Sequence, residues 1–203
     1  MPAPTAADRG REVRQRLLKA ATELIAERGW TAVSTRMLAE RASVAPGLVH
    51  YHFTSVQALL GEAAIGVIAG LVEELGPVLD HARTPEDVLE LMLSALEDYS
   101  GHDPVSLLVV ETYLAATRDD DLGRRLGGVV ADFRERLSRS LREHGVASPE
   151  ETAAVLAAAV DGVLLHHALT PGLTATTVVP VLRRVLTRSE VGRHDDRKAG
   201  GHT

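Results

Sequence analysis

The strongest constraint on the fold is a pattern of apolar residues that recur three and four positions apart, in segments separated by Gly and Pro. The first segment carries Val13, Leu17, Leu18, Ala21, Leu24 and Ile25. This spacing places the six side chains on one face of a helix that ends before Gly29. Later segments open with Thr84-Pro85, Asp103-Pro104 or Ser148-Pro149, which are helix-start signals. The sequence therefore predicts an all-α protein.

The composition excludes several kinds of site. The chain has no cysteine, so it holds no disulfide, thiolate metal site or cysteine nucleophile. Its histidines are scattered, and the adjacent His166 and His167 point about 100° apart on a helix, which is unsuited to chelation. The acidic run Asp119 to Asp121 is better explained as a helix start favoured by the helix dipole. We predict no catalytic residues, no metal and no cofactor.

No segment of the sequence looks like a membrane span or a secretory signal. The first sixteen residues lack an apolar core, and the run from Val155 to Leu169 is interrupted by Asp161, His166 and His167. We expect a cytoplasmic protein without membrane contact.

Charge is divided unevenly along the chain. Residues 1–60 contain eight Arg and Lys against five acids, a net of +3, which leaves −9 for the remainder because the whole chain carries −6. A basic end on an acidic body would orient the molecule as it approaches a polyanion such as DNA. Chance clustering on solvated helix faces is the alternative explanation.

Two short helices joined by a tight turn are predicted between Ser34 and Phe53. Ser34 caps a helix to about Ala42, Ser43-Val44 form the turn, and Pro46 begins a brief helix ending near Phe53. This arrangement allows a second helix to enter the major groove of DNA. The inward side is expected to hold Leu38, Ala39, Ala42, Val44, Val49 and Phe53. The outward side is expected to hold Pro46, Gly47, Leu48, His50, Tyr51 and His52.

The remaining segments predict a helical bundle. Thr54-Ser55 cap a helix from Val56 to about Leu79, closed by Gly76-Pro77. Further helices are expected over 85–99, 104–118, about 120–145, 149–168 and 175–189, with a full capping box at Ser148. We predict a flexible arm over 1–8, a helix-turn-helix domain over 9–55, a ligand-binding and dimerisation domain over 56–191, and a disordered tail over 192–203.

From Leu17 to Leu60 the sequence resembles the tetracycline-repressor (TetR) family. The resemblance rests on Ser34-Thr35-Arg36, Ala42-Ser43-Val44, Val49-His50-Tyr51-His52-Phe53-Thr54-Ser55 and Gln57-Ala58-Leu59-Leu60. It implies a three-helix head, a helical C-terminal bundle, and a homodimeric transcriptional repressor that a small ligand releases from a near-palindromic DNA site. A helical ligand-sensing or interaction module without DNA binding, and a transcriptional activator, are alternatives.

The resemblance also implies roles for individual residues. Arg36 reaches DNA from the flank of the groove, while Gly47 and Leu48 lie at base edges, where Leu48 suits a thymine methyl. Pro46 is a further DNA-binding position. His50 is the candidate for base reading. Tyr51, His52, Thr54 and Ser55 lie where members of the family contact phosphate. Pairing of Arg36 with Glu40, and ordinary surface positions for the two histidines, are the structural alternatives.

Three residues depart from the family pattern. Ser43 replaces a common Gly, Ala45 lacks the capping side chain usual at its position, and Val56 replaces a phosphate-binding Lys. Arg9, Arg11 and Arg14 are expected to supply the missing phosphate contacts from the arm.

The resemblance implies that the last two helices form a dimer interface, and the apolar stripes Ala153 to Leu165 and Val178 to Leu186 suit that role. The resemblance implies that the middle helices enclose a small, largely apolar ligand, with core packing as the alternative for each lining residue. The candidate lining residues are Met92, Leu96, Tyr99, Leu107, Glu111, Tyr113, Phe133 and His166.

Overall fold

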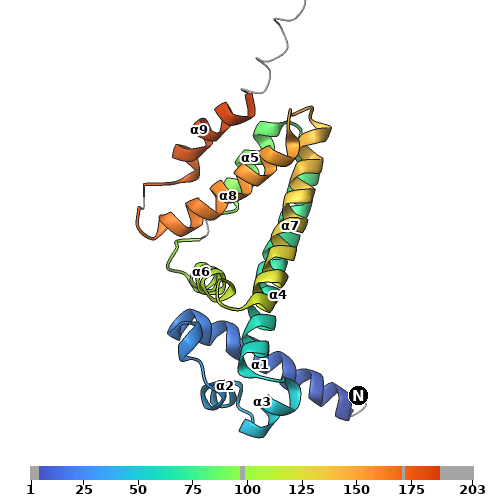
Figure 1. Ribbon diagram of the computed structural model, residues 1–203, viewed down its shortest axis with the longest axis vertical. Helices are drawn as coiled ribbons and strands as arrows, with labels where there is room; N and C mark the ends of the chain where they lie inside the picture. Colours follow the sequence, from blue (N-terminus) through green and yellow to red (C-terminus); the bar gives the residue numbers. More distant parts are fainter. Residues whose placement is uncertain (1–4, 97–98, 171, 188–203) are drawn as a thin grey trace, which may run out of the picture. The chain divides into compact units, whose positions relative to one another are not determined.

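The computed structural model describes residues 5–96, 99–170 and 172–187, and the regular elements in these ranges are all helices (Figure 1). In chain order they are α1 (Ala6–Arg28), the 3-10 helix η1 (Trp30–Ala32), α2 (Thr35–Ala42), α3 (Pro46–His52), α4 (Val56–His81), α5 (Pro85–Ser94), α6 (Pro104–Ala116), α7 (Asp120–Glu143), α8 (Pro149–His167) and α9 (Ala175–Thr187). The predicted all-α class is confirmed. The predicted tail over 192–203 lies outside the described residues.

The chain divides into two compact units. Unit 1 comprises Met1–Val72 and Gly101–Val130, and unit 2 comprises Glu73–Ser100 and Ala131–Thr203. The division differs from the boundary predicted near residue 56, because α6 packs against α1 and so belongs with the helix-turn-helix segment. Helices α4 and α7 each run from one unit into the other.

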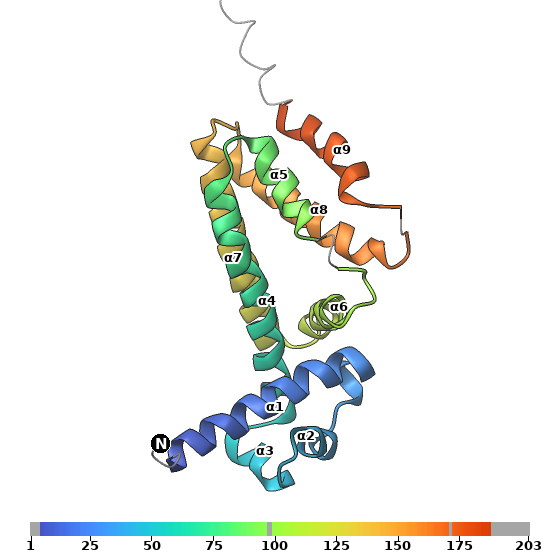
Figure 2. The ribbon, with the colours of Figure 1, turned by 180° about the vertical axis from the view of Figure 1, so that it is seen from behind.

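Unit 1 is built around α1. Its buried face consists of Leu17, Ala20, Ala21, Leu24 and Ile25, and α2 packs against it with Leu38 and Ala39 buried. In both ribbon views α2 and α3 lie together on one side of α1 (Figure 2). Because burying a Leu or Ile side chain contributes about 1.5–3 kcal/mol, this contact is a major source of stability for unit 1.

Helix α1 begins earlier than predicted. Thr5 and Asp8 form a capping box, in which the Thr5 hydroxyl accepts from the Asp8 amide at 3.1 Å and the Asp8 carboxylate accepts from the Thr5 amide at 2.9 Å. The prediction of a flexible arm over 1–8 is therefore wrong for residues 5–8. Consequently Arg9, Arg11 and Arg14 lie on a regular helix rather than on an arm.

The turn between α2 and α3 follows the sequence prediction. The Ser34 hydroxyl accepts from the Met37 amide at 3.4 Å, while Ala45 makes no side-chain cap for α3. Ser43 lies in the left-handed region with φ 54° and ψ 49°, and the Val44 amide donates to the Ala39 carbonyl at 2.9 Å. The position that is commonly Gly in the family thus holds a non-Gly residue in a conformation that favours Gly.

In unit 2, α5 packs against both α8 and α9. The core of this unit includes Val88, Leu89 and Met92 of α5 together with Ala153 and Leu156 of α8. Helix α5 ends at Ser94, short of the predicted end at Tyr99; residues 97 and 98 are outside the described ranges. Arg142 of α7 forms an ion pair with Glu150 of α8, and Arg183 of α9 forms one with Glu90 of α5.

Pro77 and Ser148 of unit 2 do not act as the sequence predicted, whereas the helix predicted over 175–189 runs through Pro180 as expected. Pro77 does not end α4, which continues to His81, and Pro180 lies inside α9. Proline has a helical φ, so buried Leu79 and Leu186 can hold the following turns in place although one backbone hydrogen bond is lost. Ser148 adopts φ 48° without a side-chain cap, so the predicted capping box does not form.

Helix α4 is long and apolar enough, by length and composition, to cross a membrane: its 18-residue window has a mean hydropathy of 1.6. Leu59, Leu60, Ala63, Ala64 and Ile68 of α4 are buried within unit 1, as in the core helix of a folded domain. The burial favours a core role for this part of α4.

Arg41 joins α2 to α1 through a forked ion pair. Its guanidinium donates to Glu27 at 2.7 and 2.9 Å and to Glu23 at 3.0 Å. The hydrogen bonds from Arg41 lower the pKa of Glu27 below its ordinary value of 4.5. This interaction fixes the C-terminal turn of α2 against α1.

We expect Ser43→Gly to raise the stability of unit 1 by about 1 kcal/mol, because Gly removes the cost of the left-handed conformation. Denaturant unfolding followed by the fluorescence of Trp30, the single tryptophan in the chain, measures the change. Ser43→Ala is the control and should give no gain, since Ala has the same conformational cost. Equal midpoints for Ser43→Gly and wild type would contradict the explanation.

Stability of unit 1 should depend on pH through Glu27. Because its folded pKa is lowered, its contribution is fully present above its ordinary pKa of 4.5 and is lost as pH falls through the folded pKa. We expect Glu27→Gln to lower the unfolding midpoint at neutral pH, and the difference from wild type to shrink below about pH 4. Glu12→Gln, an exposed site on the same helix, is the control. A difference that does not change with pH would contradict this role.

Candidate DNA-binding surface

Helix α3 has one buried side and one exposed side. Val49 is fully buried and Phe53, which follows the helix, is also buried, so these two side chains anchor α3 to unit 1. His50 and Tyr51 are exposed, and Tyr51 shows 80% of its surface to solvent. An aromatic side chain this exposed is available to a partner rather than to the core.

The other outward positions are accessible to different degrees. Pro46 and Gly47 are exposed, whereas Leu48 and His52 are half-buried. The ring of His52 packs edge-on against Tyr51, with ring centroids 5.0 Å apart and an interplanar angle of 88°. The outward side predicted from the sequence is therefore exposed as expected except at Leu48 and His52.

Flanking residues extend the exposed surface. Arg36 is exposed and, among the residues that the structure describes, has no ion-pair partner, so the alternative pairing with Glu40 does not form. Thr54 and Ser55 are exposed, and the Ser55 hydroxyl caps α4 by accepting from the Ala58 amide at 3.0 Å. The first turn of α4 thus follows α3 with its cap satisfied.

Arg14 has a structural role that the sequence did not reveal. Its guanidinium lies 4.8 Å from the centroid of the Phe53 ring and donates to the Glu62 carboxylate at 2.6 Å. Arg11 is paired with Asp8. The expectation that the arm arginines contact phosphate is thus not supported for these two, and Arg14 instead joins α1 to the end of α3 and to α4.

Trp30 connects three segments of unit 1. Its indole Nε1–H donates to the Gln57 side-chain oxygen of α4 at 2.7 Å, and its amide donates to the Glu111 carboxylate of α6 at 2.7 Å. Gly29 has φ 79°, and a Cβ there would lie 3.4 Å from a Glu111 carboxylate oxygen. Trp30 is buried, and its two polar partners cannot be identified from the sequence because they lie 27 and 81 positions away.

The predicted ligand-lining residues fall in both units. Leu107, Glu111 and Tyr113 belong to α6 in unit 1, and the other five lie in unit 2. Met92 and Phe133 are buried there, Leu96 and Tyr99 are half-buried, and His166 is exposed. Glu111 lines a cavity of about 460 Å³ in unit 1 beside Trp30, where it serves the contact just described.

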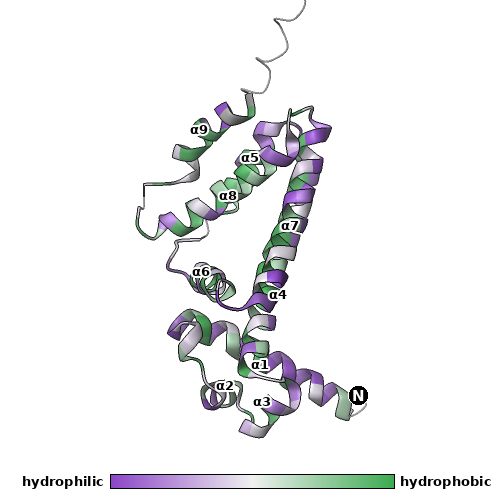
Figure 3. Ribbon diagram, in the orientation of Figure 1, coloured by the Kyte–Doolittle hydropathy of each residue, from purple (hydrophilic) through white to green (hydrophobic). Residues whose placement is uncertain are grey.

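Apolar side chains are exposed on α8, on α9 and in the residues after α8. They include Val155, Leu165, Leu169 and Val181, of which Leu169 is 79% exposed. The ribbon of α8 is largely hydrophobic (Figure 3). These positions lie within or next to the stripes predicted for dimerisation.

Comparison with known proteins shows that both halves of the chain match family models. Residues 17–63 match the model described as "Bacterial regulatory proteins, tetR family", and residues 83–188 match "Tetracyclin repressor-like, C-terminal domain". The chain is 29% identical to a member of the TetR family, SCO1917, from Streptomyces coelicolor A3, with a TM-score of 0.69 over 86% of this chain and 98% of that one.

Two mycobacterial proteins named as HTH-type transcriptional regulators are also similar to this chain. The HTH-type transcriptional repressor Rv3405c of Mycobacterium tuberculosis is 40% identical over 82 residues, which span 40% of this chain and only 41% of the relative. The uncharacterized HTH-type transcriptional regulator Rv2912c of the same organism is 26% identical over 91% of this chain and 98% of its own length. Since the C-terminal model alone covers more than half of the 203 residues, the chain belongs to the tetR family of bacterial regulatory proteins.

Proposed function

We propose that this chain is a sequence-specific DNA-binding regulator of transcription that inserts α3 into the major groove. The observation that carries the proposal is the two-sided character of α3, where Val49 is buried while His50 and Tyr51 are exposed. A short helix braced by a preceding helix, with polar and aromatic side chains outward, is suited to base and phosphate contact.

Charge supports the same assignment. The net charge of +3 over residues 1–60 favours approach of this end to phosphate, and −9 over the rest disfavours non-productive orientations. Arg36 adds a guanidinium that is not engaged by the acids of its own helix. Such a group suits either a phosphate or a guanine edge.

The regulator acts as a homodimer in this proposal. The apolar side chains exposed on α8 and α9 supply a face that a second copy would remove from water. Two α3 helices held about 34–36 Å apart would then contact successive major grooves of a near-palindromic site. Dimerisation thus determines both affinity and the spacing of the half-sites.

The mode of regulation is repression relieved by a small, largely apolar ligand. The name of Rv3405c as a repressor supports the direction of regulation. Release requires that the ligand bind the DNA-free conformation more tightly than the DNA-bound one. The site of action is the cytoplasm, where the operator DNA is found.

Selection of bound duplexes from a random pool, followed by titration at increasing salt, tests the function. We expect a near-palindromic consensus and an affinity that falls steeply with salt, by a slope of roughly −0.9 for each neutralised phosphate. Absence of duplex binding even at low salt would contradict the proposal and favour an interaction module without DNA binding.

We expect Tyr51→Ala to weaken binding to specific and random DNA alike, by roughly 2- to 10-fold, because a phosphate contact carries no sequence information. Mobility-shift titrations with both kinds of duplex provide the measurement. Tyr51→Phe should show a similar loss if the hydroxyl makes the contact. Undiminished binding of the specific duplex by Tyr51→Ala would exclude this role.

His50→Ala should alter base preference more than total affinity, since an imidazole at this position is placed to read a base edge. Parallel selections with the variant and the wild-type protein reveal the change as a relaxed position in each half-site. Recovery of the same consensus from both proteins would rule out base reading by His50.

A further inference from the structure

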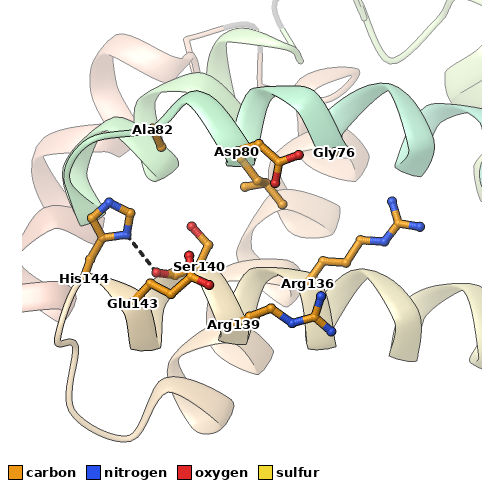
Figure 4. Close-up of a pocket in the computed structure, with 9 residues that line it drawn as sticks. Gly76, Asp80, Ala82, Arg136, Arg139, Ser140, Glu143 and His144 are labelled. Atoms are coloured by element: carbon orange, nitrogen blue, oxygen red, sulfur yellow. Dashed lines mark hydrogen bonds between the residues drawn. The ribbon is translucent and has the colours of Figure 1, made fainter.

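A polar pocket in unit 2 lies between the C-terminal end of α4 and the C-terminal part of α7 (Figure 4). Its volume is about 430 Å³, within the range of small-molecule sites. Gly76 and Asp80 of α4 face Arg136, Ser140 and Glu143 of α7 across it. The pocket contains none of the residues that the sequence predicted for ligand or DNA binding.

Ser140 provides the strongest sign that the pocket receives a ligand. The residue is only 7% exposed, and its hydroxyl has no hydrogen-bond partner among the described residues. Its carbonyl, in contrast, faces both Nδ1 of His144 at 2.8 Å and the His144 amide at 3.2 Å. Buried hydroxyls are normally hydrogen-bonded, so an unpartnered one beside a polar cavity is suited to an incoming group.

Arg136 lies on the same face of α7, four positions before Ser140. Within the described residues its guanidinium has no ion-pair partner, whereas neighbouring Arg139 is held by Glu135 at 3.2 Å. A Cβ at Gly76 would lie 3.3 Å from Nη1 of Arg136. Because Gly76 has no side chain, the Arg136 guanidinium can lie close to α4 at this position.

The pocket also contains two carboxylates. Asp80 of α4 and Glu143 of α7 are exposed and, in the described part of the chain, have no ion-pair partner. They would repel a simple anion of high charge, such as phosphate, and would attract a cationic group. Charges of both signs therefore line one small polar space.

We propose that this pocket binds a small zwitterion of the amino-acid class. Its carboxylate is received by the Arg136 guanidinium and the Ser140 hydroxyl, and its ammonium group by Asp80 and Glu143. The site is distinct from the apolar ligand site expected for the family, and the inference does not depend on DNA binding.

The test uses the full-length protein and the twenty L-amino acids, each tried singly in a thermal-shift assay, with calorimetric titration of the best. We expect at least one to bind. Its analogues that lack either the carboxylate or the ammonium group should bind roughly tenfold more weakly or worse. Failure of all twenty, or equal binding of an analogue with only one of the two charges, would overturn the proposal.

Amino-acid substitutions test whether the ligand binds in this pocket. We expect Arg136→Gln to weaken binding roughly tenfold or more, whereas Arg134→Gln, an exposed arginine of α7 outside the pocket, should leave it unchanged. Ser140→Ala should also weaken binding while raising the Tm of the ligand-free protein, because it removes a buried unpaired hydroxyl. Equal affinity of Arg136→Gln and Arg134→Gln would place the ligand elsewhere and contradict the inference.

Discussion

The buried indole of Trp30 is the interaction on which the geometry of unit 1 depends. It joins the end of α1 to Gln57 in the first turns of α4 and, through its own amide, to Glu111 of α6. Helix α3 lies between α2 and α4 in the chain, so its position is set by α2 at one end and by the start of α4 at the other. A polar group buried without a partner would be costly, and here the indole N–H orients Gln57 of α4 while the backbone amide of the same residue orients Glu111 of α6.

Packing and recognition are separated residue by residue within α3. Val49 is fixed in the core, and the next two residues point to solvent. Arg14 strengthens this arrangement from outside the helix by contacting Phe53 and Glu62 together. A helix of only seven residues would be marginal alone, so its orientation comes from such tertiary contacts rather than from helix propensity.

Local patterns in the sequence predicted the helices of unit 1, the α2–α3 turn and most of the exposed side of α3, because these features depend on neighbours within a few positions. The partners of Trp30 lie 27 and 81 positions away, and no local pattern identifies them. Pro77 and Ser148 were misjudged for a related reason: tertiary packing allowed α4 to continue through proline, and Ser148 adopted a left-handed conformation instead of a cap. Arg14 was likewise predicted to contact DNA because of its position near the N-terminus. Its guanidinium instead pairs with Glu62 of α4.

Continuity of α4 gives the two ends of this helix a physical link. Ser55 caps its start directly after α3, and its last turns carry Gly76, Pro77 and Asp80 beside the polar pocket. Pro77 has no amide hydrogen, so the backbone ladder lacks one bond near that pocket and this part of the helix is easier to deform. A ligand that binds there affects the other end only to the extent that it prefers one arrangement of α4 over another. The turn at Pro77 is where a change in the shape of α4 costs the least free energy.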